Sequence, residues 1–460
     1  MAESDVGAVD VGDRTVSSSK VSLAALTALG IGSMIGGGIF GLPQQMAGAA
    51  APGPLIIGWF ITGVGMLMLA FVYQRLAISR PEINAGVYGY ARAGFGELVG
   101  FFSAWGYWLC ATIGVTGYLV VAFEGIGTFT DTPERIIFDQ GNTFYAFMGE
   151  SLIVWAVYWL ASRGVKEAAG VNLIATIVKV FPLLLFIALA LWYFNGATFN
   201  TDFNGATLGT STLTQVKGTM LITLWVFTGV EGAAILSAHA KKRSDVGLAT
   251  VLGILIALVL YIAITVLALG ILSRADIAAL PNPSMAGVLQ AMMGTAGKII
   301  ITLCLIVSVL ASYLSWILYS MEVPYYGAKY GAFPKTLLAQ NARGVPHHSL
   351  LFSCLTIQIC LLLVQLTSNS YSTLLKISTS MILVPYLLIG AYLLQIAWRE
   401  RLTLRIRLTA VFATLYAVWI LYAAGIEHLL LAALLYVPGV ALFLYAQTRY
   451  FGYFPRLRPY

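Results

Sequence analysis

Charged residues are scarce in this chain: Asp, Glu, Lys and Arg make up 10% of its 460 residues, whereas 59% are hydrophobic. So few charges exclude a soluble globular protein, which needs a polar surface toward water. The mean hydropathy of +0.86 instead indicates an all-α polytopic membrane protein. Cysteine is equally rare. The four cysteines fall inside apolar runs without metal-site spacing, and we expect small core residues at Cys110, Cys304, Cys354 and Cys360.

Motifs of enzyme chemistry are missing as well. Three consecutive glycines at 36–38 are not followed by Lys and Ser or Thr, so they do not make a phosphate-binding loop. The sequence shows no catalytic triad and no cluster with the spacing of metal ligands. The four histidines are expected at the membrane edges: His239, His347 and His348 on the inner side and His428 on the outer side. We therefore expect a protein that is not an enzyme and that has no cofactor, no metal and no nucleic-acid partner.

Apolar runs predict about twelve membrane spans. A stretch at 80–95 is expected to be re-entrant or interfacial. Residues 1–20 are polar and lack the short apolar core of a cleaved signal, so we expect a cytoplasmic tail there, and a second one at 449–460. The expected spans are 21–50, 54–79, 97–128, 146–163, 169–194, 215–238, 246–273, 297–328, 347–368, 373–396, 406–424 and 428–448.

Basic residues are distributed unequally between the two sets of loops. With the N-terminus in the cytoplasm, 20 of the 26 Lys and Arg residues fall on the inner side and 4 on the outer side. The other two, Lys179 and Lys376, lie within spans. This bias predicts that both termini of a multi-pass cell (inner) membrane protein are cytoplasmic. It also explains the net charge of +7, because the basic loops face the anionic inner leaflet.

The first span is interrupted by glycine. Six of the residues from Leu29 to Leu42 are glycines, three of them consecutive. Glycine costs about 1 kcal/mol per residue in a helix relative to alanine, so the helix is expected to open there. Open backbone at membrane depth must line a cavity or bind something, and its N–H groups suit a carboxylate. The alternative is close packing of neighbouring helices through small residues.

The sixth span has a second such interruption at 227–232 (FTGVEG). The two breaks lie five spans apart, and an odd number of spans makes a second copy insert upside down. This spacing predicts inverted repeats with a binding site at their interface. The expected units are a first five-helix repeat at 21–194, a second, inverted repeat at 215–396, and two further helices at 406–448.

Five segments resemble the amino acid–polyamine–organocation superfamily. Two lie on its broken helices, 32–40 (GSMIGGGIF) and 225–231 (WVFTGVE), and 85–91 (AGVYGYA) resembles the loop after its second helix. Two more, 237–246 (SAHAKKRSDV) and 321–325 (MEVPY), are most similar to its basic amino acid/polyamine antiporters, above all arginine/ornithine antiporters. The resemblance implies a fold like the leucine transporter, with five-plus-five inverted repeats and broken helices 1 and 6.

The resemblance also implies a binding site. The first break would hold the substrate carboxylate and the sixth-helix break its amino group, with Tyr107 and Trp225 as aromatic gates and Trp316 stacked on the cationic end. The implied site residues are Ser33, Met34, Ile35, Gly36, Gly37, Gly38, Tyr107, Cys110, Ala111, Val115, Trp225, Phe227, Thr228, Gly229, Trp316 and Ser378. The implied gating and coupling residues are Glu231, Lys179 and Tyr386, the last at an outer gate.

Two positions depart from the family pattern. Arginine/agmatine antiporters have a serine at Gly37, so here the carboxylate would depend on backbone N–H groups and Ser33. Their pocket asparagine aligns with Val115, which removes a contact specific for guanidinium.

Two charged residues within spans have alternative interpretations. Glu231 is expected to sense protons or attract the positive end of the substrate, because a charge at membrane depth is costly. Alternatively it is a protonated cap on the second half-helix. Lys179 resembles the lysine that replaces sodium in sodium-independent relatives, and a buried lysine also permits a proton role. Alternatively it pairs with Glu322 or with carbonyl groups for packing alone.

Two more residues have open roles. Trp316 lies on an apolar run, where a tryptophan is either core or, as the resemblance implies, a cation–π partner. Glu124 lies near the outer end of the third span, where it either draws cations into a vestibule or, as we favour from sequence, is a rim carboxylate.

The expected function is therefore sodium-independent exchange of cationic amino acids, of the arginine/ornithine type. A proton-coupled amino acid symporter, for lysine or another amino acid, is the alternative on the same fold; a membrane enzyme or receptor is disfavoured. The expected partners are a small amino acid or amine and the lipid bilayer, and a homodimer stays open.

Overall fold

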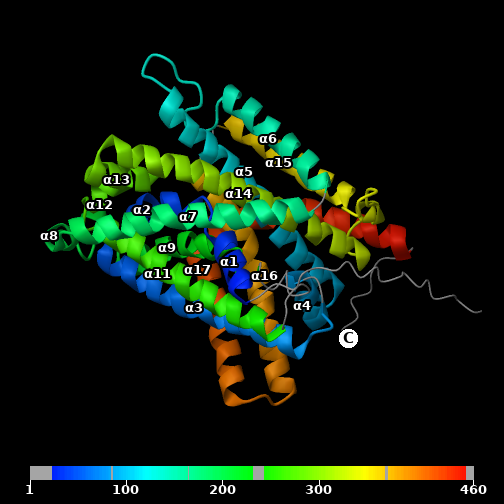
Figure 1. The fold of residues 1–460 in the computed structure, drawn as a ribbon. Helices are drawn as coiled ribbons and strands as arrows, with labels where there is room; N and C mark the ends of the chain where they lie inside the picture. The colour runs from blue at the N-terminus through cyan, green and yellow to red at the C-terminus, as the bar shows by residue number, and fades with distance from the viewer. Residues whose placement is uncertain (1–22, 84–85, 164, 232–242, 368–370, 452–460) are drawn as a thin grey trace, which may run out of the picture.

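The computed structural model describes residues 23–83, 86–163, 165–231, 243–367 and 371–451, which form helices and no strand (Figure 1). Eight of these helices are long and apolar enough to cross a membrane. Together with the composition, they indicate a polytopic helical membrane protein.

Eight long helices begin and end within a few residues of expected spans. Their ends follow the polar and Gly/Pro positions that interrupt the apolar runs. They are α3 (Pro52–Ser79), α5 (Glu97–Thr130), α6 (Phe144–Ser162), α7 (Val165–Tyr193), α11 (Arg243–Ala268), α14 (Thr295–Lys329), α15 (His347–Thr367) and α16 (Tyr371–Arg399).

The two expected interruptions are present. The first span is two short helices, α1 (Leu23–Met34) and α2 (Gly38–Ala49), so the helix opens at the glycine run. In the sixth span α9 (Thr212–Phe227) ends at Thr228, which is extended, and Gly229 follows with φ +109°. A non-glycine residue rarely adopts that φ, which accounts for glycine there. The remainder of this span, 232–242, lies outside the described residues.

The last helix, α17 (Leu404–Phe451), is interrupted at Gly425, where φ is +79° and ψ is +160°. The two halves have different neighbours. In the first half Trp419 donates to the sulfur of Met220 on α9. In the second half the carbonyl of Leu435 accepts from Trp105 on α5. The break thus falls at the expected boundary between 406–424 and 428–448.

Short helices fill the connections. The stretch expected to be interfacial contains α4 (Gly86–Phe95). The sequence prediction missed the others, although Ser273 caps α12 by accepting from the Asp276 amide, a pattern visible in the sequence. Figure 1 shows α8, α12 and α13 at one end of the bundle and α4 toward the other. The missed helices are α8 (Gly196–Asn200), η1 (Ala206–Leu208), α12 (Arg274–Ala279), α13 (Ser284–Met293) and η3 (Lys335–Leu338).

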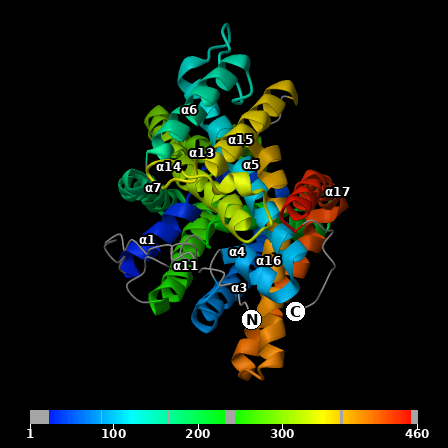
Figure 2. The same cartoon turned by 90° about the vertical axis from the view of Figure 1, so that its right-hand side faces the viewer.

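The core is centred on α5, which packs against both α14 and α16. Helices α6 and α15 pack together on one flank, while α17 lies on another (Figure 2). Large side chains on α6 are exposed, among them Leu152 at 72% and Trp159 at 56%. In a membrane protein such a surface faces lipid.

Loops expected on the same side of the membrane meet one another. Arg80 forms an ion pair with Glu400, and Arg343 donates to the carbonyl of Arg163 at 3.1 Å. These contacts join, in two pairs, four loops that the charge pattern assigns to the inner side.

Candidate functional site

The breaks in α1 and α9 meet at Ser33. Its hydroxyl lies 2.9 Å from the carbonyl oxygens of both Gly30 and Gly229. The indole nitrogen of Trp316 on α14 donates to the Ser33 carbonyl at 3.3 Å. Ser33 is 1% exposed and Trp316 4%, so this junction of three helices is buried.

The opened segment of the first span comprises residues 35–37. The Gly36 amide donates to the Met34 carbonyl at 2.9 Å, which turns the chain before α2 begins. The first amides of α2 have no partner within the helix and carry the positive end of its dipole. No side chain caps this end of α2. An anionic group such as a carboxylate therefore suits this position.

The glycines of this run are closely packed. A Cβ on any of them would lie too near a side chain from α5, α14 or α9. The nearest atoms are Tyr118 Oη for Gly36, Val309 Cγ1 for Gly37 at 2.8 Å and Trp225 Nε1 for Gly38 at 2.8 Å. Helix packing, the alternative interpretation, thus accounts for all three glycines in this conformation, and side chains of any size at these positions carry a packing cost as well as a binding cost.

Lys179 on α7 lies where the resemblance implies, between the first and eighth spans. Its ammonium donates to the Gly32 carbonyl at 3.1 Å and to the Ser312 hydroxyl on α14 at 2.7 Å. Lys179 is fully buried. Both of these partners are neutral, and neither is Glu322. Because no acid neutralises the ammonium through these contacts, it places a positive charge beside Gly32, at the end of α1.

Glu231 follows the α9 break and is 1% exposed. One carboxylate oxygen accepts from the Gly229 amide at 3.2 Å, and the other accepts from the Tyr386 hydroxyl on α16 at 3.0 Å. Tyr73 and Tyr107 also lie within electrostatic range of this carboxylate. Glu231 thus ties the α9 break to α16, while its expected capping of the second half-helix falls outside the described residues.

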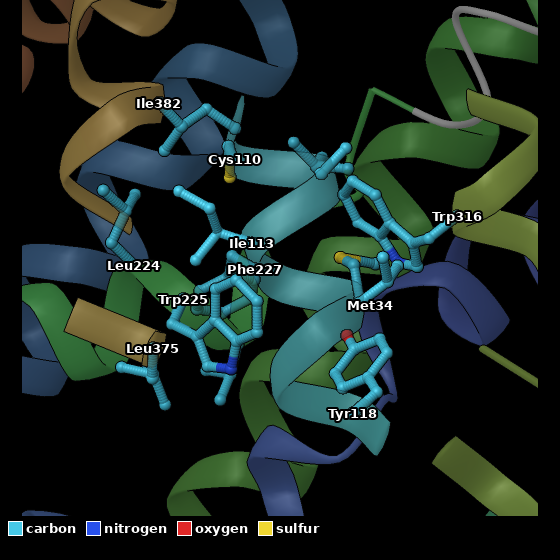
Figure 3. Packing of buried hydrophobic residues seen from close by; sticks show 14 of the residues in the cluster. Met34, Cys110, Ile113, Tyr118, Leu224, Trp225, Phe227, Trp316, Leu375 and Ile382 are labelled. Carbon is cyan, nitrogen blue, oxygen red and sulfur yellow. The ribbon is translucent and has the colours of Figure 1, made fainter. Parts of the chain in front are cut away.

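An aromatic layer surrounds Trp316. The ring of Tyr107 stacks on it with centroids 6.3 Å apart, and Tyr319 meets it edge-on at 5.6 Å. In the view of Figure 3, Met34 lies between the rings of Trp316 and Tyr118. These side chains enclose the Ser33 junction with π faces that suit a cation.

A second aromatic layer involves Trp225. Its indole nitrogen donates to the Tyr371 hydroxyl at 3.2 Å, and its ring lies 6.1 Å from that of Tyr118. Tyr371 begins α16, about 22 Å along the helix from Tyr386. Trp225 therefore contacts Tyr371 at the start of α16, while Tyr386, predicted at an outer gate, contacts Glu231.

Some of the other implied site residues make hydrogen bonds between or within helices, and the rest are apolar side chains of the core. Ser378 on α16 donates to the Cys110 carbonyl on α5 at 2.6 Å, joining two helices near Trp225. Thr228 donates to the Leu224 carbonyl at 3.2 Å. Phe227 packs edge-on against Trp59 and Tyr261, so its ring belongs to the core beside α3 and α11. Core side chains without a polar group are Ile35, Ala111 and Val115.

Comparison with known proteins decides the family. The amino acid permease family matches residues 21–452. A relative from Escherichia coli K12, provisionally named an arginine/ornithine antiporter, is 50% identical over 93% of this chain and 92% of its own length. The arginine/ornithine antiporter of Pseudomonas aeruginosa PAO1 is 45% identical over 93% of this chain and 91% of its own. The arginine/agmatine antiporter of Chlamydia felis is 38% identical over 92% and 89%.

The chain belongs to the amino acid permease family. The expected transporter family is thereby confirmed, and the structure of this permease adds residues that sequence reasoning missed. Ser312 lies one helical turn before Trp316 on α14, a spacing that places both on the same face. Tyr261 holds the carbonyl of Val226, at the end of α9, with a 2.7 Å hydrogen bond.

Among the residues that the structure describes, this permease has no group of three or more His, Cys, Asp and Glu side chains that would hold a metal ion. Two of the motifs that carried the resemblance fall partly outside those residues: 237–246 and the start of 85–91.

Proposed function

We propose that this permease exchanges cationic amino acids of the arginine/ornithine class across the inner membrane, with both termini in the cytoplasm. The observation that carries the proposal is the buried junction at Ser33, where two helix breaks and the Trp316 ring converge. The α2 amides would hold the substrate carboxylate, the carbonyls at the end of α9 its amino group, and Trp316 its side-chain cation. The names of the relatives from E. coli and P. aeruginosa support the substrate class.

The proposed architecture is two inverted five-helix repeats followed by the two halves of α17. Corresponding helices have similar lengths: 28 and 26 residues for α3 and α11, 34 and 35 for α5 and α14, 19 and 21 for α6 and α15. Each of these helices also packs against its counterpart. The α1 break also contacts its counterpart, the α9 break, through Ser33 and Gly229. Such pairing is what a twofold axis in the membrane plane would generate, with the site on the axis.

Transport is expected to be independent of sodium. The Lys179 ammonium lies between α1 and α14, where the resemblance implies a sodium site in sodium-coupled relatives, and a second cation beside it would be repelled. Arginine uptake into reconstituted vesicles should proceed equally in sodium and choline buffers. A rate that rises with sodium concentration would contradict this role of Lys179.

Trp316→Leu is expected to weaken arginine and ornithine binding roughly tenfold, from about 1–2 kcal/mol of lost cation–π energy. The affinity for citrulline, whose side chain is neutral, should fall less. Leucine also removes the hydrogen bond to the Ser33 carbonyl, so Trp316→Phe is the matched control, because it keeps a π face without the N–H. Thermal-shift titration of the three proteins measures the affinities. Equal losses for arginine and citrulline would make Trp316 a packing residue.

Counterflow tests the proposed exchange. Vesicles containing the full-length protein and loaded with labelled arginine should release it only when arginine or ornithine is present outside. Release into substrate-free buffer would contradict obligatory exchange.

A proton-coupled symporter is the second candidate. It is favoured by the neutral surroundings of Lys179, which allow a buried lysine to lose its proton. It predicts arginine uptake into empty vesicles when the outside is more acidic, which an obligatory exchanger does not show.

A further inference from the structure

One carboxylate near the site has no place in the mechanism above. Glu124 lies on α5 six residues after Tyr118, about 9 Å further along the helix. It is on the far side of the Trp225–Tyr371 layer from Trp316. Sequence favoured a rim position for this residue, but its side chain is only partly exposed and faces the backbone of Asn282, two residues before α13 begins.

Polar groups from three elements lie near Glu124 or near the side chain of Asn282. The backbone amide of Asn282 faces its carboxylate. The Asn282 side-chain oxygen is buried without a hydrogen-bond partner and lies over Gly41, 2.7 Å from where a Cβ would stand. Gln45, one turn later on α2, directs its side-chain nitrogen over the same glycine. Tyr371 lies within electrostatic range of Glu124.

In the described residues, this cluster holds two acceptors, the Glu124 carboxylate and the Asn282 oxygen, and a donor, the Gln45 nitrogen, but no ion pair. Within the described part of the chain, the three ion pairs are Arg80–Glu400, Arg92–Glu97 and Arg274–Asp202, and none involves Glu124. A partly buried carboxylate without a cationic neighbour is stabilised when a cation binds beside it. The unpaired Asn282 oxygen is an acceptor on the residue whose amide faces this carboxylate, and it suits a group with several N–H donors, such as a guanidinium or an ammonium.

The cluster also lies on the path by which a substrate from the outer side would reach the Ser33 junction. Gly41 is one turn beyond Gly37 on α2, and Glu124 is one turn beyond Val121, whose side chain covers Gly37. A substrate arriving from this end would therefore pass Glu124 before it reached the Trp225–Tyr371 contact and the α2 amides.

We infer that Glu124 and Asn282 form an outer subsite that takes the guanidinium or ammonium end of a cationic substrate before the aromatic layer opens. This inference rests on the proposed exchange of cationic amino acids. It assigns Glu124 to substrate capture from one side of the membrane only, separate from the Ser33 junction.

The test compares Glu124→Gln with wild type in intact cells, which present the outer face, and in inside-out membrane vesicles. In cells the KM for labelled arginine should rise roughly three- to tenfold with unchanged maximal rate. In inside-out vesicles the KM should stay at the wild-type value. Inhibition of arginine uptake by citrulline, which has no cationic end, should be unchanged on both sides.

Two matched controls separate the subsite from general effects. Glu134→Gln removes an exposed charge from the loop that follows α5, and Glu150→Gln replaces another buried carboxyl group, on the lipid-facing helix α6. Both should keep the wild-type KM. Glu124→Asp, which retains the carboxylate, should recover most of the affinity, whereas a KM as high as that of Glu124→Gln would assign the effect to altered packing.

The inference is overturned by an unchanged KM in cells, by an equal rise in cells and in inside-out vesicles, or by an equal effect of Glu134→Gln. A wild-type protein that exchanges no arginine at all would instead overturn the proposed function, so the two failures are distinguishable.

Discussion

Lys179→Ala is expected to abolish exchange, with a rate reduced at least about a hundredfold. The ammonium makes two buried hydrogen bonds, and those of a charged group contribute about 1.5–3 kcal/mol each. Losing both corresponds to roughly two to four powers of ten. The bonds join α7 to the carbonyl of Gly32, next to the Ser33 junction, and to α14. Without them the α1 break is no longer held against α14, which is the geometry that the substrate requires.

The Lys179 experiment needs a control for packing. Lys179→Met keeps most of the side-chain volume and removes the charge. It should therefore transport as poorly as Lys179→Ala, with a melting temperature closer to that of the wild type. Exchange of labelled arginine between vesicles and medium gives the rate, and a thermal melt of the same preparation gives stability. Near-normal exchange by the methionine variant would assign Lys179 to packing alone.

Gly37→Val is expected to remove arginine binding and also to lower the melting temperature. A Cβ at this position comes within 2.8 Å of Val309 and 3.2 Å of Tyr118, and a β-branched residue also favours a regular backbone where the helix must open. If Gly37 only left the backbone open for a carboxylate, as the sequence predicts, the variant would lose binding without losing stability. The structure changes that expectation, because the glycine is packed against α5 and α14.

Gly37→Ser combined with Val309→Ala is the more informative variant. Serine alone must displace Val309, whereas the alanine makes room for the hydroxyl. The double variant should bind arginine more tightly, since a hydrogen bond to a charged carboxylate contributes about 1.5–3 kcal/mol. Agmatine and putrescine lack the carboxylate, so their affinities should stay nearly unchanged.

Titration of arginine and agmatine against the wild type, the double variant and Val309→Ala alone measures this difference. If both ligands respond alike, Gly37 is a helix contact and the α1 break does not cradle a carboxylate.

The span boundaries and the two breaks were predictable because they depend on local properties. Apolar length sets the spans, and the glycine run at 36–38 and Gly229 show where a helix opens. The side chains that fill those openings were not predictable. Tyr118 and Val309 reach the glycines from α5 and α14, and that contact depends on how three helices tilt against one another.

The contacts of two tyrosines on α16 were equally unpredictable from sequence. Both Tyr371 and Tyr386 lie on α16, and the resemblance pointed to Tyr386 as the outer gate. Only the rotation and depth of α16 decide that Tyr371 meets Trp225 while Tyr386 meets Glu231. The depth of Lys179 could be predicted from the resemblance, but its partner Ser312 could not, because a serine on an apolar helix carries no distinctive pattern.

The position of Lys179 bears on the energy source of transport. A sodium ion that crosses with a substrate couples transport to the membrane potential, at about 2.3 kcal/mol per 100 mV. The Lys179 ammonium is covalently part of the chain and returns with the protein after each cycle. Arginine and ornithine each carry one net positive charge, so their one-for-one exchange moves no current. Under the proposed mechanism, the two concentration ratios alone would set the direction of flux, and a change in membrane voltage would leave it unaltered.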